Sequence, residues 1–177
     1  MHLILLFFSS SINGEHTLGH TGLAMKTIND AIHGQFRIDG VREELLKTPE
    51  MNKLSHIKQL GLAHLVFPGA HHTRFEHSLG VSHVSSMMAE SLGLDRYETD
   101  TVSVAALLHD VGHGPYSHTL EHILHERGGL DHMSITEGII VGDYDILRDG
   151  EDSSIQNRIS VPEILSLIHI SEPTRQP

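Results

Sequence analysis

The sequence predicts an all-α fold, a helical bundle of orthogonal and antiparallel helix pairs. Three observations predict it. Helix-capping residues are repeatedly followed by apolar side chains at helical spacing, which is typical of amphipathic helices. A nearly continuous apolar run at residues 102–108 indicates a buried helix, and glycines or a Pro-Gly pair separate the predicted helices. Helices with apolar stripes bury them against one another, so a bundle is expected.

The first predicted helix begins at Thr48, where a capping hydroxyl is followed by Pro49 and Glu50. Proline suits the first helical position, and an acid suits the first turn. Three apolar residues follow at helical spacing: Met51, Leu54 and Ile57. Gly61 is expected to end this helix. Residues 63–70, which contain a Pro-Gly pair, are expected to form a loop or a short extended piece.

A second helix is expected after Thr73, because Thr73 and Glu76 have the spacing of a capping box. This helix is predicted to run to about Leu92 and to be closed by Gly93. Its apolar side chains form one stripe, which is expected to face the core: Phe75, Leu79, Val84, Met87 and Met88.

Three more helices are expected in the second half of the chain. The buried helix at residues 102–108 is broken by the Gly-His-Gly-Pro segment at residues 112–115. Ser117 is expected to cap a helix that runs to about residue 127, and Asp131 to cap one that runs to about residue 141. Residues 142–154 are acidic and rich in turn formers, so they are expected to form a solvated loop.

The composition excludes several classes of protein. The 177 residues carry 12 basic and 23 acidic side chains, so the net charge of −11 argues against broad binding to nucleic acid. Cysteine is absent, which excludes disulfides and thiolate metal sites. There are 17 histidines, and they are concentrated between His64 and His132. Because histidine is the commonest metal ligand, this concentration suggests a metal site.

The two ends of the chain are set apart from the predicted fold. Residues 1–24 are expected to be a non-native or wrongly assigned leader, because Met25 offers another start. The apolar run at residues 3–8 is too short to span a membrane, so no membrane association is expected. Residues 166–177 look like translated sequencing adapter. One domain is therefore expected at residues 25–165, in a cytoplasmic protein.

A metal site is predicted where the buried helix ends in His109 and Asp110. Neighbouring residues on a helix point about 100° apart, so an ion between them can take one ligand from each. His77, from the helix that begins after Thr73, would supply a second imidazole. Two nitrogens and one oxygen suit a divalent ion such as Mn, Fe, Zn or Mg. The alternative is structural, with His109 as a helix-end partner and Asp110 as a cap.

Two segments carry a resemblance to a known family. RFEHSLG at residues 74–80 and HDVGHGPYSH at residues 109–118 resemble the two signature segments of the HD superfamily of metal-dependent phosphohydrolases. Within it, the chain is most similar to the SAM-and-HD-domain deoxynucleotide triphosphohydrolases and their prokaryotic relatives. The similarity runs from about Met25 to about Val141, and two long motifs in the same order make it specific.

The resemblance implies roles for five residues in binding. His77, His109 and Asp110 match the family's metal ligands. Arg74 matches an arginine that contacts phosphate, and it lies one turn before His77 on the same helix face. Gln59 matches a residue that contacts the nucleoside.

Four further residues match catalytic or active-site positions of the family. His118 and Glu121 match a catalytic pair, in which the carboxylate would orient the imidazole and raise its pKa. His113 matches a residue that approaches the substrate phosphates, and His132 matches another active-site histidine. The remaining nearby histidines are interpreted as surface or packing residues: His71, His72, His83, His122 and His125.

The function that the resemblance implies is hydrolysis of a nucleotide substrate, a deoxynucleoside triphosphate, to deoxynucleoside and triphosphate. The family has a fourth metal ligand, an aspartate far downstream, and Asp143 and Asp145 come too early to match it. The HD bundle is therefore expected to be truncated at its C-terminus, and the chain by itself to be a poor enzyme. A homo-oligomer is compatible with the sequence.

Three other functions stay open at this point. One is hydrolysis of another phosphate ester, such as a nucleoside monophosphate or a cyclic dinucleotide. A second is a noncatalytic, regulatory HD module. The third is a metalloprotease, since residues 118–122 fit the pattern H-x-x-E-H. That short match ignores His77, His109 and Asp110, and a His122 variant would distinguish it, because only a protease would need His122.

Overall fold

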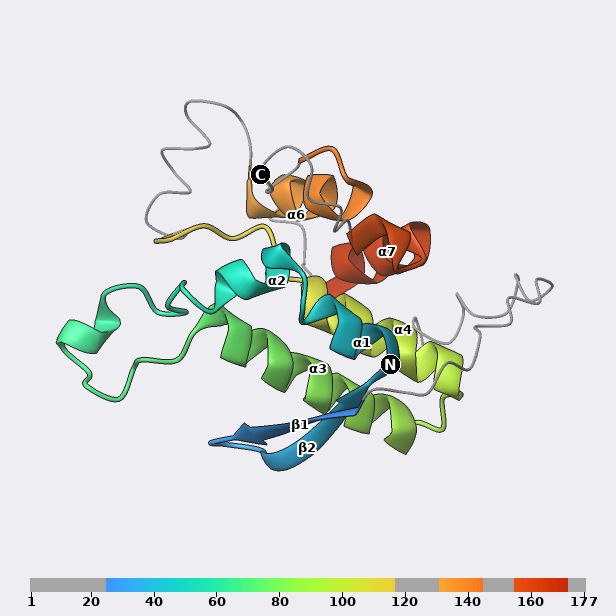
Figure 1. The fold of residues 1–177 in the computed structure, drawn as a ribbon, viewed down its shortest axis with the longest axis horizontal. Helices are drawn as coiled ribbons and strands as arrows, with labels where there is room; N and C mark the ends of the chain where they lie inside the picture. The colour runs from blue at the N-terminus through green and yellow to red at the C-terminus, as the bar shows by residue number, and fades with distance from the viewer. Residues whose placement is uncertain (1–24, 117–130, 145–154, 172–177) are drawn as a thin grey trace.

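The computed structural model describes residues 25–116, 131–144 and 155–171. Over these residues the chain is mostly helical, as predicted, with one small β-hairpin beside the helices (Figure 1). The elements in chain order are β1 (Met25–Asp30), β2 (Gly34–Asp39), α1 (Gly40–Leu45), α2 (Pro49–Leu54), η1 (Ala63–Leu65), α3 (Arg74–Ser91), α4 (Arg96–Leu108), α6 (His132–Val141), η2 (Ile155–Asn157) and α7 (Val161–Ser171).

The β-hairpin is an element that the sequence analysis missed. Strands β1 and β2 are antiparallel, with Met25 opposite Asp39 and Asp30 opposite Gly34. The Asp30 carboxylate accepts hydrogen bonds from the backbone N–H groups of Ile32 and His33, which fixes the turn. Only β2 contributes fully buried side chains, Phe36 and Ile38.

Helix α2 begins as predicted and ends earlier than predicted. Thr48 is its N-cap and accepts a hydrogen bond from the backbone N–H of Met51. The helix stops at Leu54, not near Gly61, because the following backbone pairs with the segment before α3. The N–H of Arg74 donates to the carbonyl of Ile57 at 2.8 Å, and the N–H of Gln59 donates to the carbonyl of His72 at 3.1 Å.

Helices α3 and α4 lie side by side as an antiparallel pair at the centre of the molecule (Figure 1). The predicted capping box of Thr73 and Glu76 is present, and Leu92 is the C-cap before Gly93, whose φ is +75°. Helix α4 contains the predicted apolar run at residues 102–108 and starts earlier, at a second capping box formed by Asp95 with Glu98.

The predicted apolar stripe on α3 is wrong for most of its length. Leu79 is buried and Phe75 is partly buried, whereas Val84, Met87 and Met88 are exposed. The face that packs on α4 is made of small side chains: Ser78, Ser82, Ser86 and Ala89. The Ser82 hydroxyl donates to the carbonyl of Ser103 on α4 at 2.8 Å. Small residues let the two helices approach closely, so the larger apolar side chains of α3 lie on its exposed face.

Helices α6 and α7 complete the core against α4. Asp131 caps α6 as predicted, by accepting from the backbone N–H of Ser134, and the helix ends at Gly142 in the left-handed conformation. Ile140 of α6 and Ile164 and Ile168 of α7 are buried. Part of the segment that resembles adapter sequence thus lies within α7. The helix predicted from Ser117 and most of the predicted acidic loop lie outside the described residues.

None of the described helices is both long enough and apolar enough to span a bilayer.

Candidate metal centre

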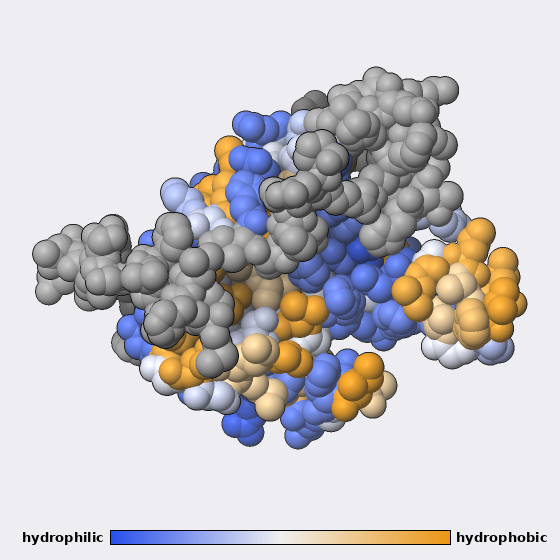
Figure 2. Space-filling model, turned by 180° about the vertical axis from the view of Figure 1, so that it is seen from behind, coloured by the Kyte–Doolittle hydropathy of each residue, from blue (hydrophilic) through white to orange (hydrophobic). Residues whose placement is uncertain are grey.

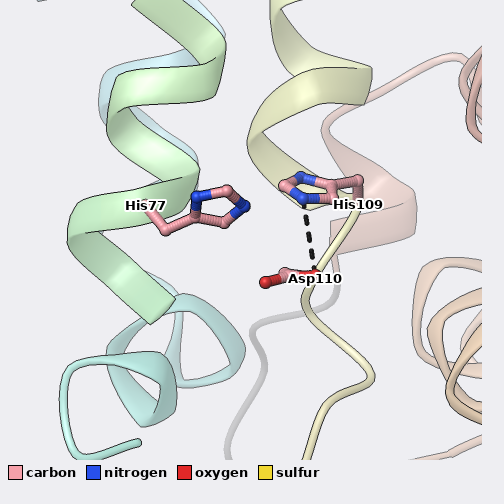
Figure 3. A group of neighbouring side chains, drawn as sticks. All are labelled: His77, His109 and Asp110. Carbon is pink, nitrogen blue, oxygen red and sulfur yellow. Dashed lines mark ion pairs between the residues drawn. The ribbon is translucent and has the colours of Figure 1, made fainter. Parts of the chain in front are cut away.

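Three side chains from two helices meet at one end of the α3–α4 pair. His77 is in the first turn of α3, His109 is the C-cap residue of α4, and Asp110 follows it. Each offers one ligand atom, and these atoms all lie within 4.8 Å of one another. Figure 3 shows the two imidazoles and the carboxylate pointing toward a common point between the helices. These are the three residues that the sequence analysis selected as ligands.

The orientation of His109 suits a metal ligand. Its Nδ1 atom lies 2.8 Å from the carbonyl of Ala106, one turn earlier in α4. A proton on Nδ1 would donate to this carbonyl and leave the lone pair of Nε2 facing Asp110 and His77. The Nε2 atom is 3.4 Å from Oδ1 of Asp110, and the rings of His77 and His109 are 5.3 Å apart. Two imidazoles and a carboxylate without sulfur are donors that fit a divalent ion.

Arg74 lies beside this cluster and is bound to one of its members. Its Nη1 atom donates to Oδ2 of Asp110 at 2.7 Å, and only 1% of Arg74 and 6% of Asp110 are exposed. The sequence analysis predicted a cation next to the metal site. In the structure this cation forms a buried ion pair with Asp110. A buried pair of this kind holds both groups in a fixed geometry.

The protonation states of the cluster follow from its charges. Burial raises the pKa of Asp110, but the charges of His109, His113 and Arg74 outweigh burial, and its pKa falls below the usual value. Burial lowers the pKa of His77, and Asp110 only partly opposes this effect. At neutral pH the site therefore contains a carboxylate and a neutral His77 imidazole, the forms that bind metal.

His113 and His132 lie beside the cluster. His113 is buried, and its Nε2 atom is 3.3 Å from Oδ1 of Asp110. His132 is the first residue of α6, and its ring stacks on that of His113 at 4.3 Å. The family resemblance implies active-site roles for both residues, and the structure brings both to the same place. His118 and Glu121, the predicted catalytic pair, lie outside the described residues.

The residues of this cluster lie in a part of the chain that matches a known protein family. The family model of the HD domain matches residues 74–159 of the sequence. This span contains all three residues of the cluster. The chain belongs to the HD-domain family. A solved structure of a phosphohydrolase from Bacteroides thetaiotaomicron has a TM-score of 0.63 and 33% identity, over 82% of this chain and 34% of that one. A hypothetical protein from Aquifex aeolicus gives 0.61 and 34%, over 83% and 42%.

Curated relatives of this HD-domain chain are similar over part of their length. Human deoxynucleoside triphosphate triphosphohydrolase SAMHD1 is 35% identical over 161 residues, which are 78% of this chain and 26% of that protein. An uncharacterised protein of Methanocaldococcus jannaschii is 43% identical over 116 residues, 63% of this chain and 25% of that one. The chain therefore spans about a quarter of the length of these relatives.

Gln59 and the other histidines of the HD-domain chain lie farther out. Gln59 is half-buried in the loop before α3, and its side-chain Oε1 is buried without a hydrogen-bond partner among the described residues. His83 stacks on Phe36 at 4.2 Å, which is a packing role. His71 and His72 are exposed. His122 and His125 lie outside the described residues.

The HD loop after Asp110 has two supports that the sequence analysis missed. Lys53 of α2 donates from Nζ to the carbonyl of Val111 at 2.8 Å, and Thr136 of α6 accepts from the N–H of Gly112 at 3.0 Å. Neither residue belongs to the matched motifs. Lys53 is 58 positions from its partner in sequence, so no local pattern could have revealed the contact.

Proposed function

We propose that this chain forms a metal-dependent phosphohydrolase site for nucleotides, and that its substrate is a deoxynucleoside triphosphate, cleaved to deoxynucleoside and triphosphate. The observation that carries the proposal is the cluster of His77, His109 and Asp110 with the Arg74 guanidinium beside it. A metal-binding donor set next to a fixed cation suits a substrate with negatively charged oxygens.

The three ligand residues fit a divalent ion such as Mn, Fe, Zn or Mg. When bound, such an ion would supply a water of lowered pKa and would neutralise phosphate charge. Asp110 contributes an ionised oxygen, and the imidazole of His109 is held by the Ala106 carbonyl, so neither ligand needs to rearrange. Arg74 fixes the other oxygen of Asp110 and places positive charge where a phosphate would lie.

The remaining residues have proposed roles around that phosphate. His113, buried against Asp110, would face the equatorial oxygens, and His132 would hold the His113 ring by stacking. His118 would donate a proton to the leaving 5′ oxygen, with Glu121 orienting its imidazole. Gln59, with a buried amide oxygen, would contact the nucleoside.

The finer proposal, triphosphate release from a deoxynucleotide, is supported by relatives. The SAMHD1 proteins of human and cattle are deoxynucleoside triphosphate triphosphohydrolases, and they are 35% and 43% identical to this chain over the matched parts. No broad binding to nucleic acid is proposed, because the net charge is −11.

The experiment measures metal content and product identity together. Wild type, His109→Ala and the surface control His56→Ala are loaded with Mn²⁺ and analysed for bound metal. Each is then given deoxynucleoside triphosphates, nucleoside monophosphates and a cyclic dinucleotide. We expect about one metal per chain in wild type and His56→Ala, a clear loss in His109→Ala, and triphosphate as the product. Equal metal in all three proteins would refute the site, and release of orthophosphate alone would refute the substrate.

A further inference from the structure

The backbone that follows the ligand pair is held from two opposite sides. On one side the ammonium of Lys53 donates to the carbonyl of Val111 at 2.8 Å. On the other side the N–H of Gly112 donates to the hydroxyl of Thr136 at 3.0 Å. Val111 and Thr136 are completely buried. These contacts connect α2 and α6 to one peptide group, the Val111–Gly112 peptide, which is the second peptide after Asp110.

Gly112 shows how closely the HD loop approaches α6. A Cβ atom at this position would overlap the backbone N and the hydroxyl of Thr136 and the carbonyl of His132. The loop therefore cannot move toward α6, and a side chain could not be accommodated without displacement. On the carbonyl side of the same peptide, the hydrogen bond from Lys53 restrains the loop.

The position of Lys53 also fits the end of helix α4. The last carbonyls of a helix lack intrahelical partners and carry partial negative charge, so a cation stabilises them. Helix α4 ends at Leu108, and the N–H of Val111 turns back to the carbonyl of Leu108 at 3.0 Å. The carbonyl of Val111, just beyond this turn, accepts from the ammonium of Lys53.

Burial of a lysine here has a cost that an apolar residue would avoid. Burial lowers the pKa of Lys53, and Glu50, one turn earlier on α2, partly opposes this change. An apolar side chain of similar length would fill the same space without desolvating a charge. What the lysine adds is a directed, charge-assisted hydrogen bond to one backbone atom.

We propose that Lys53 is a positioning residue of the metal centre. By fixing the Val111 carbonyl, it sets the Val111–Gly112 peptide, and through this peptide it restrains the backbone of Asp110 and the direction of the Asp110 carboxylate toward His77. Thr136 does the same from the other side through Gly112. This inference rests on the metal site of the proposed function, and it assigns Lys53 no contact with metal or substrate.

The test compares Lys53→Met, Lys53→Arg and Lys47→Met, each as the whole chain. Lys53→Met keeps the stem and removes the donor, Lys53→Arg keeps a donor, and Lys47→Met removes an exposed lysine that pairs with Glu43. Co²⁺ alone is titrated into each protein, and its visible absorption, which reports ligand geometry, is recorded. Thermal unfolding without metal is measured in parallel.

We expect Lys53→Met to bind Co²⁺ about 10-fold more weakly, in the range found for residues that orient metal ligands, with an altered absorption spectrum. Lys53→Arg should recover most of the affinity and the wild-type spectrum, and Lys47→Met should match wild type. If Lys53→Met does not fold, Thr136→Val takes its place with the same expectation.

Two results would overturn the inference, and they differ. If wild type binds Co²⁺ and Lys53→Met binds it equally with an unchanged spectrum, even at a lower melting temperature, Lys53 is structural only and the proposed function stands. If wild type binds no Co²⁺, the metal site itself is refuted, and the proposed function falls together with the role of Lys53.

Discussion

The charges of the candidate site converge on Asp110. Its Oδ2 atom accepts from Arg74, and its Oδ1 atom lies within 3.4 Å of Nε2 of both His109 and His113. A buried carboxylate is unfavourable unless it is paired, and here one partner is permanently charged. Arg74 therefore has a structural role at the site in addition to the phosphate contact proposed for it.

Replacing Arg74 with alanine is expected to lower the free energy of unfolding of the metal-free protein by about 3 kcal/mol, because it leaves a buried carboxylate without its cation. A divalent ion bound beside Asp110 would restore positive charge there. Saturating Mn²⁺ is therefore expected to raise the melting temperature of Arg74→Ala by more than that of wild type.

Arg96→Ala is the matched control for this prediction. Arg96 also pairs with two aspartates, Asp39 and Asp100, but its side chain is 68% exposed. An exposed pair contributes no more than about 1 kcal/mol, so a small effect and no special response to Mn²⁺ are expected. The role of Arg74 would be contradicted by an Arg74→Ala protein that is as stable as Arg96→Ala.

The three clustered side chains of this site could be selected from the sequence, but their supports could not. His109 and Asp110 stood out because they are adjacent and end an apolar helix, and His77 because it lies in a motif. The Arg74–Asp110 pair spans 36 positions and the Lys53–Val111 contact spans 58. Such contacts depend on how helices pack, which local patterns do not encode.

Helix α3 has two faces whose roles are the reverse of what hydrophobicity predicts. Serines at positions 78, 82 and 86 face α4, whereas Met87 and Met88 are 53% and 60% exposed. Close packing of the two helices leaves no room for larger side chains between them. Because this interface is narrow, the imidazole rings of His77 and His109 lie close together, with their centroids 5.3 Å apart.

Ser82→Leu is expected to lower the free energy of unfolding by about 1–3 kcal/mol, because the added volume pushes α3 away from α4 and the hydroxyl bond to Ser103 is lost. Met88→Gln, on the opposite face, is expected to change it by no more than about 0.5 kcal/mol. Chemical denaturation of both variants measures the difference. The reverse order would show that the apolar stripe is buried after all.

The elements that the sequence predicted well are those with local signals. The caps at Thr48, Thr73 and Asp131 mark the true starts of their helices, because a cap acts on backbone groups two or three residues away. The β-hairpin was missed because its first strand is largely exposed and has little apolar alternation. The α3 stripe was wrong because periodicity finds an apolar face without showing what covers it.

Within the part of the chain that the structure describes, an apolar segment projects from the body of the molecule. The loop between α2 and α3 extends from the body, and Figure 2 shows hydrophobic surface gathered on a protruding part of the molecule. Its large side chains are more than half exposed: Leu60, Leu62, Leu65, Val66 and Phe67. An exposed cluster of this kind favours association, which accords with the expectation of a homo-oligomer.

The double variant Leu65→Ser and Phe67→Ser is therefore expected to weaken self-association several-fold while leaving the melting temperature nearly unchanged, since both side chains are outside the core. Sedimentation velocity over a range of concentrations measures the effect. The exposed pair Ile32→Ser and Met25→Ser, on the β-hairpin, serves as the control. Identical association of wild type and the loop variant would show that the loop is not an association surface.

The three ligands and Arg74 all belong to one helical hairpin, residues 73–113, formed by α3, α4 and the loop after α4. For protein engineering, this means that the candidate metal centre could be transferred to another protein as one contiguous segment. Grafted into another helical bundle, the hairpin would bring the donor set and its cation with it, already registered by the serine-lined interface. The host would need to supply the outside contacts of the hairpin, among them a cation for the carbonyl of Val111 and acceptors for the N–H groups of Gly112 and Arg74.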